Sequence, residues 1–230
     1  LNPGSLSLTD VDDVTVGTVA TIGIQTGDPA GGGNVTINAT NGTITVNSPI
    51  TTAVGTGGGI SLDGSIDINS TLTAASGNIS LNGSGTGALD LAIDADLSSN
   101  ISMTLTAPRD IIVGAAVSAT LTTTGAGADI TLTADSETTP DGFGGIQIAA
   151  LGGINSADAV TLTGSDLFIT VGTIDSVEVA SDGTTAQVLA AGNVLVQDGA
   201  DAPANAQTII NGVVNASGTI TITAEDDVLL

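Results

Sequence analysis

The chain has 230 residues, 24 acidic side chains and one basic one, Arg109, so its formal net charge is −23. It contains no Lys, His, Cys, Trp or Tyr and only two Phe, which leaves too few cations and aromatic rings for binding nucleic acid. No run of about 18 apolar residues is present to span a bilayer, yet hydrophobic residues make up 41% of the chain, which predicts a folded protein.

Short runs that alternate apolar and polar residues recur along the whole chain. Their first residues are Leu6, Val35, Ile60, Ile79, Ile101, Ile130, Val160, Val194 and Ile220. The intervals between them range from 19 to 34 residues and average about 27. Strict alternation over β-prone residues is typical of strands with one buried face. The sequence therefore predicts an all-β repeat protein.

A second alternating run follows most of the first ones after a short turn. These second runs are Val14–Val16, Thr43–Val46, Ser65–Ile68, Leu89–Ile93, Ile111–Val113, Ile146–Ile148, Phe168–Val171 and Val228–Leu230. A third, weaker apolar position then precedes the next repeat. It is filled by Ile50, Leu72, Leu97, Val117, Ile154 and Val213.

Two or three short strands per repeat, separated by unequal turns, are typical of the coils of a parallel β-helix. We predict one solenoid domain over residues 1–230, with about 8 to 9 coils stacked roughly 4.8 Å apart. Longer repeats are accommodated when the extra residues project as loops, as we expect for 27–33, 136–144 and 199–206. The competing interpretation is a pair of immunoglobulin-type sandwiches, but the chain lacks the core Trp, Tyr and Cys of such domains.

The two ends of the chain are similar to each other. Residues 3–16 align in phase with residues 217–230, and the match includes an Asp-Asp turn. We therefore expect either continuation into further repeats of a longer protein or end-to-end self-association of copies.

Residues 100–119 (NISMTLTAPRDIIVGAAVSA), and residues 129–134 with their sequel 145–148, resemble the repeats of filamentous haemagglutinin-like and autotransporter-type bacterial adhesins. The likeness is one of pattern and runs through nearly the whole chain. It implies a right-handed β-helix on the bacterial cell surface that serves as a stalk, adhesin or fibre. The secretion domain of that family carries Asn-Pro-Asn motifs, of which Asn2-Pro3-Gly4 retains only part, so the chain resembles the stalk.

Acidic turns raise the question of calcium. Asp12-Asp13, Asp110 and Asp226-Asp227 fall between first and second runs, where stacked coils could bring carboxylates to a shared Ca²⁺. Asp is also a good turn former whose side chain bonds its own backbone. Because the tandem Gly-Gly-x-Gly-x-Asp pattern of calcium-binding β-rolls is absent, the sequence assigns no metal ligand and no cofactor.

Asp90, Asp94 and Asp96 lie close together, as the carboxylates of a polysaccharide hydrolase or lyase would. Such enzymes add His, Lys or Arg for proton transfer and aromatic platforms for the sugar. The chain offers Arg109 alone, so we predict that it is not an enzyme. Arg109 is expected to pair with Asp110 or with an Asp on an adjacent coil.

The outward positions of the first runs are nearly all hydroxyls: Ser7, Thr36, Ser61, Ser80, Ser102, Thr131, Thr161 and Thr221. A flat Thr ladder is one way in which solenoids bind ice, whereas Ser and Thr are also ordinary solvent-side residues of a strand. Unequal coil lengths are expected to spoil the regular spacing that ice requires.

Taken together, these features predict a non-enzymatic structural or adhesive segment of a secreted or cell-surface bacterial protein. It would neither bind nucleic acid nor insert into a membrane. The alternative is an adhesin module whose loops bind a host or matrix ligand, and cutting away 136–144 would then abolish binding. A filament instead predicts polymerisation of the isolated segment.

Overall fold

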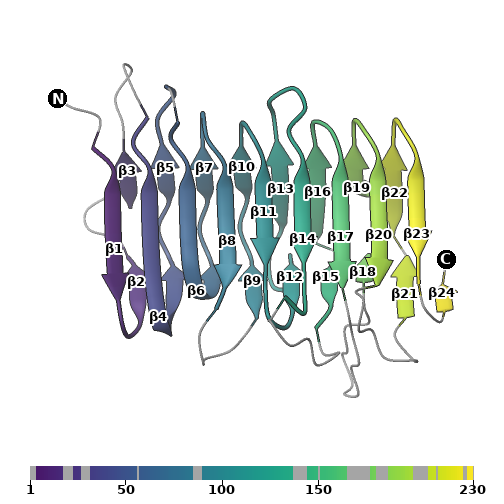
Figure 1. The fold of residues 1–230 in the computed structure, drawn as a ribbon, viewed down its shortest axis with the longest axis horizontal. Coiled ribbons are helices and arrows are strands. Elements are labelled where there is room, and N and C mark those ends of the chain that lie inside the picture. Colours follow the sequence, from purple (N-terminus) through teal and green to yellow (C-terminus); the bar gives the residue numbers. More distant parts are fainter. Residues whose placement is uncertain are drawn as a thin grey trace.

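A computed structural model describes residues 4–17, 23–26, 32–55, 57–84, 90–136, 144–149, 151–164, 177–179, 186–198, 207–210, 212–224 and 227–229. All regular structure in these ranges is β-strand, without any helix. The strands form one 16-stranded and one 8-stranded sheet, and they lie side by side along the long axis of the molecule (Figure 1).

Three rows of strands repeat in chain order. The first row contains β1 (Leu6–Asp10), the first parts of β4 (Val35–Val46) and β6 (Ile60–Ile68), β8 (Ile79–Gly83), β11 (Met103–Thr106), β14 (Ile130–Thr133), β17 (Val160–Gly164), β20 (Val194–Asp198) and β23 (Ile220–Thr223). Each strand pairs in parallel with the next one of its row, as β11 does with β8 and β14. This row is the near face of the stack in Figure 1.

The second row belongs to the same 16-stranded sheet. It contains β2 (Val14–Val16), the second parts of β4 and β6, β9 (Leu91–Ile93), β12 (Ile111–Val113), β15 (Ile146–Ile148), β18 (Val177–Val179), β21 (Gln207–Ile210) and β24 (Asp227–Leu229). The strand β6 connects the rows, because it pairs with β8 through its first part and with β9 through its second. Gly64 stands at the change of direction with a φ of 152°, which favours glycine.

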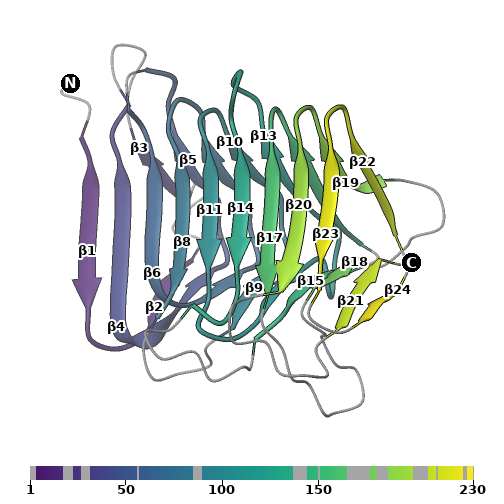
Figure 2. The ribbon, with the colours of Figure 1, turned by 45° about the vertical axis from the view of Figure 1, so that its right-hand side comes forward.

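The third row is the 8-stranded sheet, on the far side of the molecule (Figures 1 and 2). It contains β3 (Ile24–Thr26), β5 (Ile50–Thr52), β7 (Leu72–Ala74), β10 (Leu97–Ser99), β13 (Ala119–Thr123), β16 (Gly152–Ser156), β19 (Ala186–Ala190) and β22 (Val213–Ala216). Every strand pairing among the described residues of the two sheets is parallel, as for β10 with β7 and β13. The fold is therefore all-β, parallel and solenoid-like, and the antiparallel sandwich interpretation is wrong.

The core lies between the rows and consists of stacked aliphatic side chains. Leu62, Leu81, Leu105 and Leu132 follow one another across neighbouring strands, and each is at most 1% exposed. They belong to a hydrophobic cluster that extends from Val14 to Ile210. Alternation buries every second side chain of a strand, so the described strands fill the interior with aliphatic side chains.

The structure shifts three predicted positions. The fifth first-row strand begins at Met103, which pairs with Ile79 and Ile130, while Ile101 lies before the strand and is 48% exposed. In the third row Leu121, not Val117, pairs with Leu97. Similarly, Val214, not Val213, pairs with Val188. Ile101 and Val117 are exposed apolar residues that precede their strands, and Val213 is the exposed first residue of β22.

Other predictions fall on residues outside the described ranges. The second run Phe168–Val171 lies there, and the strand that pairs with β15 is β18 instead. Most of the loops predicted for 27–33, 136–144 and 199–206 lie outside the described residues as well.

Candidate functional site

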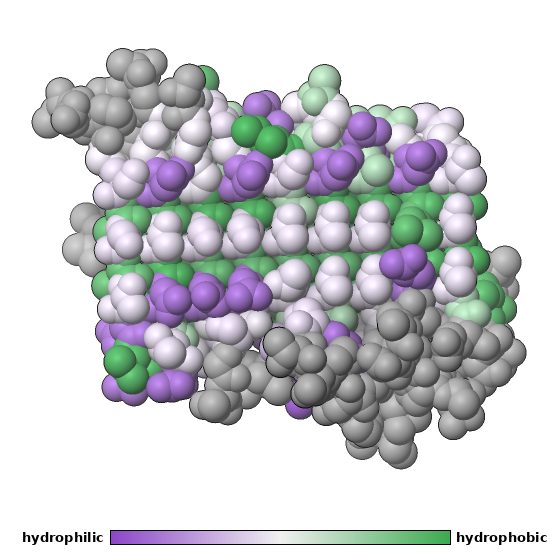
Figure 3. Space-filling view, in the orientation of Figure 1, coloured by the Kyte–Doolittle hydropathy of each residue, from purple (hydrophilic) through white to green (hydrophobic). Residues whose placement is uncertain are grey.

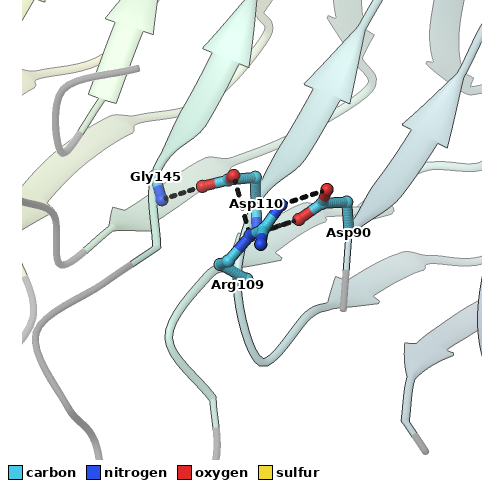
Figure 4. A network of polar contacts seen from close by, with 4 residues as sticks. All are labelled: Asp90, Arg109, Asp110 and Gly145. Carbon is cyan, nitrogen blue, oxygen red and sulfur yellow. Dashed lines mark hydrogen bonds and ion pairs between the residues drawn. The ribbon is translucent and has the colours of Figure 1, made fainter. Parts of the chain in front are cut away.

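The sole cation of the chain sits in a cluster of carboxylates at the turns before second-row strands (Figure 4). Asp90 precedes β9, while Arg109 and Asp110 precede β12. The Nη2 atom of Arg109 lies 2.6 Å from Asp90 Oδ2, and its Nε atom donates to Asp90 Oδ1 at 2.8 Å. The same Nε lies 3.3 Å from Asp110 Oδ2. The sequence predicted that Arg109 pairs with Asp110 or with an Asp of an adjacent coil, and the structure shows both contacts.

Burial controls the electrostatics of Asp110. Its side chain is only 4% exposed, and this burial raises the pKa of the carboxyl above its ordinary value. The negative charge of Asp90 raises it further, whereas the hydrogen bond from Gly145 N, at 3.0 Å, and the Arg109 guanidinium act in the opposite direction. The hydrogen bond to Asp90 raises the pKa of Arg109. The cluster links three neighbouring strands, β9, β12 and β15, by charge-assisted bonds.

The acidic turn near the amino terminus bonds to backbone. Asp10 Oδ1 accepts hydrogen bonds from the N–H groups of Val11 and Asp12, and Asp13 Oδ1 accepts one from Thr43 N at 2.8 Å. These are the contacts of a turn-forming Asp. Asp226 lies outside the described residues, and Asp227 belongs to β24, at the opposite end of the stack from β2. Asp13 and Asp227 therefore belong to opposite ends of the stack.

Asp94 and Asp96 also bond to the backbone of the neighbouring repeat. Asp94 Oδ1 accepts from Ala116 N at 2.9 Å, and Asp96 Oδ1 accepts from Thr120 N at 2.9 Å. Asp94 is partly exposed and Asp96 is exposed, and each side chain joins its repeat to the next one. Asp90, the third carboxylate of the predicted group, is held instead by Arg109.

The described residues contain no group of three or more acidic, His or Cys side chains arranged to hold a metal ion. They also contain no helix with the length and apolarity needed to cross a membrane.

The outward side of the first row carries two columns of side chains, all polar except Leu195, which we call the hydroxyl face. The first column is Ser7, Thr36, Ser61, Ser80, Thr104, Thr131, Thr161, Leu195 and Thr221. The second column is Thr9, Asn38, Asp63, Asn82, Thr106, Thr133, Thr163, Gln197 and Thr223. The sequence identified the first column except at Thr104, because it placed that strand two residues early and chose Ser102.

The columns appear as straight rows across the near face of the molecule in Figure 3. A shallow groove of about 240 Å³ lies at the upstream end of three strands, where it is lined by Thr36, Ser61, Ser80 and the preceding Asn34 and Asn78. Each lining hydroxyl belongs to the first column.

Sequence reasoning missed the hydrogen bonds that support this face. Within the second column, Asn38 Nδ2 donates to Asp63 Oδ2 at 3.2 Å, and Asn82 Nδ2 donates to Asp63 Oδ1 at 2.9 Å. The hydroxyl of Thr106 in turn donates to Asn82 Oδ1 at 2.8 Å. The network therefore crosses four strands. Repeated Asn and Asp at the fourth position of the runs is the sequence signal that would have predicted it.

A second missed feature stands just before the first-row strands. Alternate repeats place an amide or carboxylate oxygen there, which accepts a hydrogen bond from the backbone of the next repeat. The pairs are Asn34 with Gly59 N, Asn78 with Ser102 N, Asp129 with Ala159 N and Asn193 with Thr219 N. An Asn or Asp directly before an alternating run is its sequence signal.

Comparisons with protein-family models, with curated proteins and with solved structures find no match for this chain. The resemblance to adhesin repeats therefore stays a prediction from the sequence pattern.

Proposed function

We propose that the chain is a non-enzymatic, structural or adhesive β-helical segment of a secreted or cell-surface bacterial protein. The observation that supports this most is the unbroken parallel ladder from β1 to β23, backed by one continuous aliphatic cluster. Such a ladder resists deformation because each strand is hydrogen-bonded to both neighbours along the axis. The proposal includes a single right-handed solenoid of about 8 to 9 coils, which spans roughly 40 Å at about 4.8 Å per coil.

The distribution of polar bonds fits a mechanical role. The bonds of Arg109, Asp94, Asp96 and Asp129 all join one repeat to the next. These bonds add to the backbone hydrogen bonds that already connect successive repeats. Acidity contributes solubility, since a net charge of −23 opposes lateral aggregation of a β-rich surface.

We further propose that copies or further repeats stack on the outermost strands. Large apolar side chains are exposed there: Leu8 on β1 is 39% exposed, Ile220 on β23 is 43% exposed and Val228 on β24 is 42% exposed. Their counterparts within the stack are covered by the next strand. A corresponding strand from another copy, or from a further repeat, would cover these exposed side chains in the same way.

Electron microscopy of the purified chain, with and without Ca²⁺, tests this proposal. We expect straight rods that join end to end, and fibre formation should be lost in Ile220→Lys. Thr221→Lys is the matched control, because it adds the same positive charge to the neighbouring residue, whose side chain points outward. Isolated rods unaffected by Ile220→Lys would contradict stacking while leaving the solenoid in place. Compact particles without an elongated axis would contradict the solenoid itself.

A further inference from the structure

We propose that the hydroxyl face binds ice, with its two columns of predominantly short polar side chains as the contact surface. The proposal concerns a different surface from that of end-to-end stacking, and it does not depend on self-assembly. It requires that the face be regular, rigid and chemically suited to crystalline water, and each requirement is met by described residues.

Regularity comes from the register of the ladder. Thr104 pairs with Thr131 and Thr131 with Thr161, and Thr106, Thr133 and Thr163 pair in the same way. The pairing continues to both ends without a register shift within the columns, and the shift between β4 and β6 comes only after Asn38. The expectation that unequal coil lengths would spoil the spacing is therefore wrong. The additional residues lie between strands, so neighbouring side chains keep the strand spacing of about 4.8 Å.

Rigidity comes from side chains with few accessible conformations. Thr is β-branched and stiff at χ1, and it provides most of the columns from β11 onward. Upstream, the bonds from Asn38 and Asn82 to Asp63 hold the longer side chains in place. A contact surface that is ordered before binding loses little conformational entropy on binding.

The chemistry of the face favours a neutral, ordered partner. Asp63 is the only charged residue in the two columns, although the chain carries 24 acidic side chains. Each Thr presents a methyl group beside a hydroxyl, so the face can hydrogen-bond ordered water while keeping little affinity for ions. The columns contain no aromatic ring, the usual platform for a sugar, which favours ice over a polysaccharide. Leu195 interrupts the first column near one end.

Thermal hysteresis, crystal shaping and inhibition of ice recrystallisation test the proposal with the full chain. We expect the wild type to show all three and Thr131→Lys, near the centre of the first column, to lose them. Thr122→Lys is the control, because Thr122 is an outward, half-buried Thr on the third-row strand β13. We expect this variant to keep wild-type activity. Thr161→Lys, one strand away, gives a second test if Thr131→Lys fails to show the wild-type circular dichroism and melting.

Two results would overturn the proposal. Folded wild type without hysteresis or recrystallisation inhibition would do so, as would activity that survives both Thr131→Lys and Thr161→Lys. Insoluble cellulose and chitin serve as further probes. Binding to them, lost in Thr131→Lys and without effect on ice, would assign the face to a neutral polysaccharide instead.

Discussion

Arg109 and Asp90 form a two-point contact across neighbouring strands, with Nη2–Oδ2 at 2.6 Å and Nε–Oδ1 at 2.8 Å. Arg109 is 45% exposed, and an exposed ion pair alone contributes only about 0–1 kcal/mol to folding. Its greater importance comes from Asp110, the buried carboxylate that contacts the same guanidinium.

We predict that Arg109→Ala lowers the free energy of unfolding by about 1–3 kcal/mol, because it leaves the buried Asp110 carboxylate without its cation. The measurement is urea denaturation at pH 7. The double variant Arg109→Ala/Asp110→Asn should recover part of the loss, since it also removes the uncompensated charge. Additive losses in the double variant would contradict this account.

Asp110 makes stability depend on pH. Its pKa is raised above 3.8 in the folded protein, so the folded state binds this proton more tightly than the unfolded state. The stability contributed by this group is full below 3.8 and is lost as the pH rises through the raised pKa. Asp110→Asn keeps an oxygen for Gly145 N but does not titrate.

The unfolding free energy of Asp110→Asn, relative to wild type, should therefore rise with pH from about 3.8 and become level above the folded-state pKa. Urea denaturation of the wild type and of Asp110→Asn at several pH values measures this difference in unfolding free energy. The contributions of the other carboxylates are the same in both proteins and therefore cancel. A difference that stays constant or falls with pH would refute the prediction.

A buried hydroxyl provides a third prediction. Thr52 is 0% exposed, and its Oγ1 donates to Gly58 O in the turn that follows β5. Thr52→Val removes this donor and should cost about 1–3 kcal/mol. Thr51→Val, one residue away on the outward side of the same strand, should change stability by less than about 0.5 kcal/mol. Equal losses in a thermal melt would show that the hydroxyl contributes nothing specific.

Alanine substitutions at two glycines with similar φ angles distinguish the cost of a left-handed backbone from the cost of steric crowding. Gly114 has φ 74°, and a Cβ there would lie 2.3 Å from Gly152 N. Gly127 has φ 72°, but the nearest atom to its Cβ would be Asp158 Oδ2 at 3.9 Å. Gly127→Ala should cost about 1–2 kcal/mol for the left-handed conformation alone. Gly114→Ala should cost clearly more, because β16 must move, and comparable denaturation midpoints would contradict this.

The hydrogen bonds made just before the first-row strands can be tested at Asp129. Its Oδ1 accepts a hydrogen bond from Ala159 N at 3.0 Å. Asp129→Ala should lower stability by about 1 kcal/mol, whereas Asp129→Asn keeps an acceptor and removes one of many negative charges. Asp129→Asn should therefore melt at or above the wild-type temperature. A loss as large as that of the Ala variant would show that the charge, and not the hydrogen bond, matters.

The sequence by itself determined the strands and their faces. Alternation such as Ile130-Thr131-Leu132-Thr133 places two side chains inside and two outside whatever the neighbouring strands are, because the period of a strand is a local property. The same reasoning failed at Ile101 and Val117, where an apolar residue in a turn resembles the start of a strand.

Only the tertiary structure decided which residues meet across repeats. The intervals between repeats vary, so no fixed spacing predicts that Asp90 meets Arg109, 19 positions along, or that Asp110 meets Gly145, 35 positions along. Backbone hydrogen bonding sets the register of each parallel pair and moves the additional residues between the strands. That register also aligns Thr104, Thr131 and Thr161 into one column, a regularity that the unequal repeat lengths conceal in the sequence.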